Sequence, residues 1–347
     1  MSHSRFHAPP APDWKPPENP LVSVVTPSFN MCHYLELTIQ SVLAQDYQHV
    51  EHIVQDAASQ DGTLAMLEKY QGRVQWISEP DDGEPDGLNR ALKRCTGDLI
   101  LVLNADDILL PQACSWAVQQ FRQYPQVAVI YGDQVNIDEM GQPISASYGP
   151  DPYDYERIFC VEGVIPAQAA FIRRDCLEDV GFYADASLDI CPDHEMWVRI
   201  GQRFPMLHVS EMICHYRLHA DARGQRRDQV VNMIRTKWLV TLRTIAEPQC
   251  PPTIRRMKRR ARGGILRWAS DVFWGNGQRW TALGLRIVAW FVYPWRIRLL
   301  STAQGVSGKT SLVMGRSFSW LLESTYGWRS RLKLTRRHFL NGRFDKT

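Results

Sequence analysis

Short, mostly apolar runs alternate with longer amphipathic segments over the first hundred residues of the chain. Four runs are too short for helices and are typical of buried strands: residues 21–25, 52–55, 74–78 and 99–103. Three intervening segments place apolar residues at helical spacing: 34–45, 63–70 and 87–95. This alternation predicts an α/β fold built on a doubly wound, mainly parallel sheet.

Polar residues gather where the predicted strands end. Asp56 follows the second run, and Asn104, Asp106 and Asp107 follow the fourth. In open α/β sheets, ligands bind outside the carboxyl ends of the strands, so we expect these side chains to line one cleft. Paired carboxylates suit Mg²⁺ or Mn²⁺, which commonly also binds substrate phosphates. Asp106 or Asp107 could equally cap the helix that begins near Pro111.

Two further residues could carry chemistry in the later part of this region. Met196, Trp197 and Ile200 recur at helical spacing and place Asp193 at the start of a helix. The carboxylate of Asp193 could cap that helix or act as a general base. His219 closes the region, and its imidazole could bind a metal or be structural.

The glycine-rich motifs that cradle phosphates are missing from the sequence. No GxGxxG follows any predicted strand, which counts against a dinucleotide-binding dehydrogenase. Residues 307–310 do not complete a P-loop, because Ala303 stands where the first glycine is required. We therefore expect a phosphate ligand to be held through a metal ion.

The formal net charge of +3 over 347 residues hides a sharp division along the chain. Residues 1–220 hold 14 Lys and Arg against 31 Asp and Glu, whereas residues 221–347 hold 26 against 6. We therefore expect two parts with different roles: an acidic domain at 21–222, and a mostly helical basic extension at 223–347 that faces an anionic partner. Residues 1–20 are expected to be a flexible tail, because they hold six prolines and lack the apolar core of a signal peptide.

Cysteines and tryptophans bear on where the protein works. Eight scattered cysteines without a CxxC pair indicate reduced thiols in a cytoplasmic protein. Residues 287–295 are nine positions without charge, too few for the roughly 20 that span a bilayer. With Arg286, Arg296 and Arg298 at its flanks, and eight of twelve tryptophans beyond residue 220, this segment fits a membrane interface. Nucleic acid is the less favoured anionic partner. A third possibility is that the basic helices pack on the acidic domain through arginine pairs.

Five motifs occur in a fixed order along the acidic half. They are VSVVTPSFN at 22–30, QDAASQDGT at 55–63, WISEPD at 76–81, GLNRA at 87–91, and TGD at 96–98 followed by NADD at 104–107. This ordered set resembles family 2 glycosyltransferases, and the resemblance covers about residues 21–220. It implies a GT-A fold, a nucleotide-diphosphate sugar donor, Mg²⁺ or Mn²⁺ as cofactor, and inversion at the anomeric carbon.

The resemblance also implies roles for individual residues. Asp193 matches the acid that deprotonates the acceptor hydroxyl, and Gln168 and Glu195 match the acceptor side of the cleft. Three positions match metal ligands: Asp106, Asp107 and His219. The positions matching the donor site are Thr26, Pro27, Ser28, Asp56, Asp86, Asn89, Asn104 and Asp106.

Two residues depart from the family pattern, which usually has an acid at the position of Gln55 and often one at Asn104. We expect these changes to weaken a contact rather than abolish binding, provided that Asp106 and Asp107 remain. The resulting hypothesis is an inverting glycosyltransferase at the cytoplasmic face of the cell membrane. It would extend a glycan or lipid-linked acceptor in polysaccharide or cell-envelope biosynthesis. A nucleotide-sugar-binding pseudo-enzyme and a metal-dependent nucleotidyltransferase stay open as alternatives.

Overall fold

The computed structural model describes residues 7–147, 152–185, 187–188, 190–220, 222 and 227–294. These residues contain a nine-stranded sheet in which the strands are ordered β3-β2-β1-β4-β8-β6-β9-β5, with β7 paired to β6. The strands are β1 (Val22–Ser28), β2 (Val50–Asp56), β3 (Gln75–Ser78), β4 (Leu99–Val102), β5 (Ile108–Leu109), β6 (Val129–Ile137), β7 (Pro143–Ser147), β8 (Ala170–Arg173) and β9 (Met206–Arg217).

Helices connect these strands and continue beyond the last one. The helices of the strand-containing region are α1 (Cys32–Leu43), α2 (Thr63–Glu68), α3 (Glu84–Arg94), α4 (Ala113–Gln123), α5 (Tyr155–Phe159), η1 (Ala167–Ala169), α6 (Arg174–Asp179) and α7 (Pro192–Arg203). After β9 come η3 (Arg227–Gln229), α8 (Val230–Ala246), α9 (Pro252–Arg256), α10 (Lys258–Gly275) and α11 (Arg279–Val292).

The sheet is parallel on one side and mixed on the other. β3, β2, β1 and β4 are neighbours and run parallel, as the strand-helix alternation predicts. β8 then pairs antiparallel with both β4 and β6, and β9 runs parallel to β6. The predicted α/β fold class is therefore confirmed, with antiparallel pairs added beyond β4.

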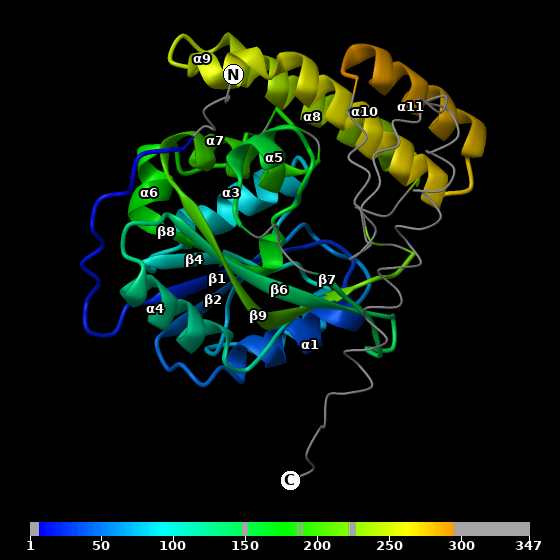
Figure 1. Cartoon of the computed structure of the whole chain (residues 1–347). Helices are drawn as coiled ribbons and strands as arrows, with labels where there is room; N and C mark the ends of the chain where they lie inside the picture. The colour runs from blue at the N-terminus through cyan, green and yellow to red at the C-terminus, as the bar shows by residue number, and fades with distance from the viewer. Residues whose placement is uncertain are drawn as a thin grey trace, which may run out of the picture. The chain divides into compact units, whose positions relative to one another are not determined.

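Helices cover both faces of the sheet (Figure 1). Val24 of β1 belongs to the same apolar cluster as Val42 of α1. The next residue, Val25, belongs to the cluster on the opposite face, with Leu88 of α3 and Trp197 of α7. Successive residues of a strand point to opposite faces, so a strand covered on both sides must be apolar throughout. This explains the continuous apolar runs seen in the sequence.

The carboxyl ends of the parallel strands define one edge of the sheet, where Ser28, Asp56 and Ser78 are register partners. β9 points the same way as β1, because β6 is antiparallel to β8 and β8 is antiparallel to β4. α7 ends shortly before β9 starts, at the opposite edge, and its 12 residues extend about 18 Å along the sheet. We infer that its first turn, which holds Asp193, lies toward the carboxyl edge.

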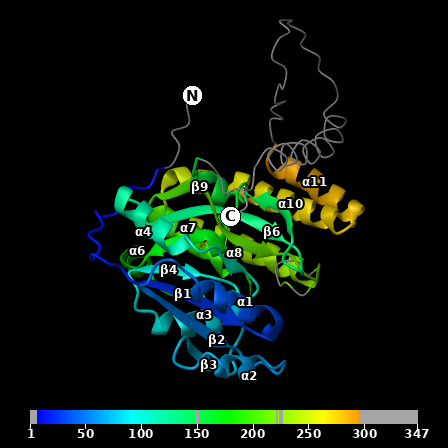
Figure 2. The ribbon, with the colours of Figure 1, turned by 90° about the horizontal axis from the view of Figure 1, so that it is seen from below.

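The helices after β9 form a layer outside α5 and α7 (Figure 1), and within it α10 and α11 lie side by side (Figure 2). α10 approaches the end of α5 so closely that a Cβ at Gly264 would overlap the Cys160 carbonyl oxygen. Trp268 of α10 contacts a cluster that contains Ile190, three residues before Asp193. The basic helices therefore support the start of α7.

Two arginines of these helices pair with acids of the strand-containing region. Arg260 of α10 lies 2.9 Å from Glu156 and 2.8 Å from Glu162. Arg243 of α8 pairs with Asp185. Pairing with the acidic region, the third possibility drawn from the charge division, therefore accounts for part of the positive charge.

Part of the segment expected to be a flexible tail makes fixed contacts. The Ala11 amide donates to the Gln126 carbonyl at 2.8 Å, and the Arg173 guanidinium donates to the Pro12 carbonyl at 2.8 Å. The Trp14 ring meets the Phe121 ring of α4 edge-on, with centroids 5.6 Å apart. Ala11 and Trp14, two apolar residues in this proline-rich segment, also pack against the apolar clusters of the strand-containing region.

Two findings bear on the expectations about compartment. All eight cysteines are free thiols, and six of them are buried. Within the ranges given above, no helix is both long enough and apolar enough to cross a bilayer. Trp295, Arg296 and Arg298 of the predicted interfacial segment lie outside the described residues, as do residues 307–310.

Candidate active site

The acidic turn after β4 places its two aspartates in different surroundings. Oδ2 of Asp106 lies 2.9 Å from Nε2 of His219. The Asp107 carboxylate is fully buried and accepts hydrogen bonds from the Arg217 amide and from Nδ2 of Asn104, both at 2.9 Å. Burial, reinforced by the neighbouring charge of Asp106, raises the pKa of Asp107 well above its usual value. Asp107 and Asn104 therefore fix the turn, whereas Asp106 meets His219.

His219 is enclosed by side chains that the sequence did not single out. Its ring lies 4.8 Å from the Tyr34 ring, and the Arg217 guanidinium lies 4.8 Å above that same tyrosine. Arg217 also donates to the Asp106 carbonyl at 3.0 Å. The segment that ends in His219 contains Arg217, which could have been noticed as a cation beside two acids. Tyr34 carried no comparable signal.

The pair of Asp106 and His219 fits a divalent cation in its donor chemistry. A carboxylate suits Mg²⁺ and Mn²⁺, and imidazole is the commonest side-chain metal ligand. Nε2 of His219 is the nitrogen directed at Asp106, whereas Nδ1 is buried and has no hydrogen-bond partner among the described residues. Within that same part of the chain, no group of three or more His, Cys, Asp or Glu is arranged to hold an ion. Substrate oxygens would therefore have to complete the coordination.

The residues expected to hold the nucleotide lie at the ends of β1 and β2. The Asp56 carboxylate is fully buried and accepts from the Ser59 amide at 2.9 Å, from the Ser59 hydroxyl at 2.5 Å and from the Ser78 hydroxyl at 2.6 Å. Asp56 therefore caps the turn at Ser59, although its two carboxylate oxygens can accept further bonds. Its register partner Ser28 has a buried hydroxyl without a partner among the described residues. Thr26 Oγ1 lies 3.0 Å from His52 Nε2.

Pro27 lies between Thr26 and Ser28 on β1 and is the register partner of Gln55. The Gln55 side chain is buried, accepts from Arg94 of α3 at 3.0 Å and donates to Glu79 at 3.4 Å. The departure from the family pattern at this position is therefore a buried amide that bridges the partly exposed side chains of Arg94 and Glu79. An acid at residue 55 would form an ion pair with Arg94.

Two residues of α3 expected at the donor site make protein contacts. Asp86 pairs with Arg90 at 2.8 Å. The Asn89 side chain donates to the Ala184 carbonyl at 2.9 Å and accepts from the Ala184 amide at 2.8 Å. Asn89 therefore fastens the loop that leads to α7 onto α3, which positions Asp193 from a distance.

The residues expected on the acceptor side come from η1 and α7. Gln168 is buried and donates to Gln134 of β6 at 2.6 Å. It precedes β8, which runs antiparallel to β4 and begins beside the carboxyl end of that strand, so Gln168 lies close to the carboxyl edge. Glu195 makes two bonds to Arg199, at 2.7 and 2.9 Å.

Asp193 differs from these neighbours because no described residue binds its carboxylate. It is half-buried and forms no hydrogen bond or ion pair with any residue that the structure describes. The N-cap of α7 is Cys191, in the left-handed region with φ of 59°, and no side chain caps the helix by a hydrogen bond. The sequence allows Asp193 to cap this helix or to act as a general base. The cap is not formed, so among the described residues the Asp193 carboxylate remains available at this end of the helix.

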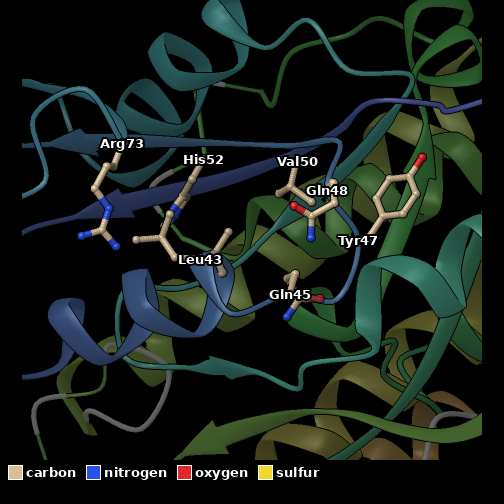
Figure 3. Close-up of a pocket in the computed structure, with 8 residues that line it drawn as sticks. Leu43, Gln45, Tyr47, Gln48, Val50, His52 and Arg73 are labelled. Carbon is tan, nitrogen blue, oxygen red and sulfur yellow. The ribbon is translucent and has the colours of Figure 1, made fainter.

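A separate hollow lies at the other edge of the sheet (Figure 3). It has a volume of about 170 Å³ and is lined by residues that include Leu43, Gln45, Val50 and His52. Val50 is the first residue of β2, so this hollow lies at the amino ends of the strands and is distinct from the candidate site. Complete burial lowers the pKa of His52 to about 3.

Known proteins share part of this sequence. Residues 23–181 match the model of Glycosyl transferase family 2. An uncharacterized glycosyltransferase of Mycobacterium tuberculosis is 30% identical over 200 residues, which are 57% of this chain and 75% of that protein. The chondroitin synthase of Escherichia coli is 29% identical over 206 residues, or 58% of this chain and 29% of that protein.

Solved structures with low sequence identity share the fold. S. aureus TarS 1–349 in complex with UDP-GlcNAc has a TM-score of 0.58 and 17% identity, covering 78% of this chain and 81% of that one. The mannosyltransferase of Pyrobaculum calidifontis in complex with GDP-Man and Mn²⁺ has a TM-score of 0.55 and 16% identity, covering 84% and 79%. The fold of this chain thus has known counterparts.

Proposed function

Because the chain belongs to glycosyl transferase family 2, we propose that it moves a sugar, with inversion, from a nucleotide-diphosphate donor to a hydroxyl of a glycan or lipid-linked acceptor. One observation carries this proposal. A carboxylate-histidine pair, Asp106 and His219, lies at the carboxyl edge of the sheet, and the first turn of α7, which holds Asp193, is inferred to lie toward the same edge. An inverting transfer needs these two functions, at the leaving group and at the attacking hydroxyl.

Asp106 and His219 would hold Mg²⁺ or Mn²⁺. A divalent ion bound there would offset negative charge on the departing nucleoside diphosphate. Asp107 has a different part in this proposal from the one its sequence position implied. Its buried carboxylate accepts hydrogen bonds from the Asn104 side-chain amide and the Arg217 backbone amide. Asp107 therefore fixes the turn that presents Asp106. The complex of a similar fold with GDP-Man and Mn²⁺ supports the choice of ion.

The donor nucleotide would lie over the ends of β1 and β2. The buried hydroxyl of Ser28 has no hydrogen-bond partner among the described residues, and a bound ligand would supply one. Asp56 can accept an additional bond from a ribose hydroxyl or a base N–H. Thr26 and Pro27 would shape this end of the site, and Asp86 and Asn89 would support it through α3.

Asp193 would act as the general base. As the acceptor oxygen attacks the anomeric carbon, its proton passes to the Asp193 carboxylate. The bond between the anomeric carbon and the diphosphate oxygen breaks, and the nucleoside diphosphate leaves with the bonding electrons. Attack opposite the leaving group inverts the carbon. Gln168 and Glu195 would orient the acceptor, Glu195 through its fixed contact with Arg199.

The acceptor would belong to a polysaccharide or to the cell envelope. Relatives carry the names chondroitin synthase, hyaluronan synthase and O-antigen biosynthesis protein, although each of these matches covers only a part of the named protein. We place the enzyme at the cytoplasmic face of the cell membrane, where a lipid-linked acceptor would be found.

The products of the purified chain with a panel of nucleotide sugars test this function. Donors are first screened for thermal stabilisation with and without Mn²⁺, since a ligand at about 100 times its dissociation constant stabilises by about 2.7 kcal/mol. Release of a nucleoside diphosphate together with a glycosylated acceptor supports the proposal. Release of pyrophosphate would instead indicate a nucleotidyltransferase. Stabilisation by a donor without turnover of any acceptor tried would favour the pseudo-enzyme.

A further inference from the structure

The last described helix, α11, exposes a row of large apolar side chains. Trp280, Ile287 and Phe291 are 86%, 52% and 70% exposed. At 3.6 residues per turn these three lie within about 40° of one another, on the side of the helix opposite the buried Ala282 and Ala289. Isolated apolar residues are ordinary on a protein surface, but an aligned row of this size indicates a site that meets another apolar surface.

A cluster of cations borders the end of this row. Arg255, Arg256, Lys258 and Arg259 are exposed at α9 and the start of α10. Arg259 donates to the carbonyl of Val292 at 3.1 Å, which places the cluster beside the end of α11 that bears Phe291. Arg256 and Lys258 bind no acceptor within the described part of the chain, so their charges are available.

We propose that the apolar row of α11 and the cationic cluster together form a surface that binds the headgroup region of a membrane containing anionic lipids. The apolar side chains would enter the boundary between headgroups and acyl chains, and the cations would contact lipid phosphates. α11 has 14 residues and is about 21 Å long, short of the roughly 30 Å needed to span the hydrocarbon core. Tryptophan, here Trp280, is the side chain most typical of this boundary.

The positive charge and the exposed apolar side chains of this surface together favour a lipid surface over a second copy of the chain or nucleic acid. A second copy of the chain would bring two cationic clusters into one symmetric interface, where like charges repel. Nucleic acid would neutralise the cations but leave Trp280 and Phe291 in water. Over residues 227–294, Lys and Arg number 13 against 3 Asp and Glu, so the positive charge extends over the whole layer.

The structure links this surface to the acceptor side of the cleft, and this step rests on the proposed function. Arg260, the residue after Arg259, holds Glu162 at 2.8 Å. Glu162 starts the segment that reaches Gln168, one of the residues proposed to meet the acceptor. A lipid-linked acceptor in the bound membrane would therefore lie on the side where its hydroxyl is needed.

Cosedimentation of the full chain with vesicles tests the proposal. Vesicles of phosphatidylcholine and phosphatidylglycerol in equal parts are compared with phosphatidylcholine alone. The variant Ile287→Glu with Phe291→Glu should lower the partition coefficient on the mixed vesicles at least about tenfold, or about 1.4 kcal/mol, which is less than burial of one such side chain contributes. The control Met140→Glu changes an exposed residue of the β6–β7 turn and should bind as the unmodified chain.

A second variant, Arg256→Glu with Lys258→Glu, should remove the preference for phosphatidylglycerol. The proposal is overturned if the α11 variant sediments like the control, if phosphatidylglycerol makes no difference, or if the α11 change breaks a dimer instead. Both altered residues of α11 are exposed, so an unchanged thermal midpoint verifies folding, and Ile287→Ser with Phe291→Ser offers a milder test. Transfer to a soluble acceptor, measured on the same variants, should be retained. If the unmodified chain binds vesicles but transfers nothing, the proposed function fails and this surface does not.

Discussion

Arg260 is expected to hold the basic helical layer on the strand-containing region. Its replacement by alanine should lower the stability of the protein and weaken its binding of the acceptor. The guanidinium makes three contacts with carboxylates: two with Glu162, at 2.9 and 2.8 Å, and one with Glu156 at 2.9 Å. Hydrogen bonds to Glu162 raise the pKa of Arg260 further above its usual value, so it stays charged. The variant would leave two acids facing each other on the outside of α5.

The magnitude follows from burial. The side chains of Arg260, Glu156 and Glu162 are 24%, 16% and 10% exposed. Removing one partner of a fully buried pair costs about 3–5 kcal/mol, and an exposed pair contributes at most about 1 kcal/mol. Because all three side chains retain some water, we expect Arg260→Ala to lower the free energy of unfolding by about 2–3 kcal/mol. The acceptor KM should rise, since Glu162 begins the segment that carries Gln168.

Urea unfolding of four chains measures this effect: the unmodified protein, Arg260→Ala, Glu162→Ala and the double variant. The coupling energy of the cycle should be about 1–2 kcal/mol. Arg256→Ala is the matched control, because Arg256 is exposed and binds no described acceptor, and it should change stability by less than about 0.5 kcal/mol. The reasoning is refuted if Arg260→Ala matches Arg256→Ala, or if the coupling energy is zero within error.

Three further predictions concern packing, pH and metal. Gly264→Ala should destabilise the protein by about 2 kcal/mol or more in urea unfolding, because the added Cβ would meet the Cys160 carbonyl. Gly284→Ala, with open space around its Cβ, should stabilise α11 by about 0.5–1 kcal/mol in the same assay. His52 has a folded pKa of about 3, below its unfolded value, so the unfolded state binds more protons as the pH falls below about 6.5, and the free energy of unfolding decreases. His52→Gln should make the decrease between pH 7 and pH 5 smaller by about 2 kcal/mol in urea titrations. A decrease identical to that of the unmodified protein would contradict the argument. Asp106→Asn should remove most of the Mn²⁺ dependence of donor binding, by tenfold or more in dissociation constant measured with Mn²⁺ and with chelator; a dependence that survives would exclude Asp106 as a ligand.

The parallel half of the fold could be predicted from the sequence because each strand there is buried on both faces. A run such as residues 99–103 leaves no other arrangement when turn residues and amphipathic segments surround it. β8 could not be predicted in the same way. Its four residues lead directly into α6 without a turn, and its antiparallel place between β4 and β6 depends on contacts distant in sequence.

The candidate site shows a similar limit at the level of single residues. The sequence located Asp106 and Asp107 correctly at the end of β4, but adjacent residues of a turn point in different directions, and only coordinates reveal that Asp107 is buried. The assignment of Asn89 to the donor site could not anticipate its contact with Ala184, 95 positions away. The close approach of α10 to Cys160 did have a signal, the pair Gly263 and Gly264 inside a helix, which is unfavourable unless another backbone lies there.

Turnover by Asp193→Asn tests the central claim most directly, because that claim divides the reaction between Asp193 and the Asp106–His219 pair. The dissociation constant of the donor with Mn²⁺ should remain within about twofold, since the altered carboxylate lies outside the donor site. The rate of transfer in a single turnover should fall by about 10²–10⁴, the usual contribution of a general base. Asp179→Asn, which changes an acid of α6 paired with Arg203, should leave both quantities unchanged. Transfer by Asp193→Asn at the rate of the unmodified enzyme would contradict the account.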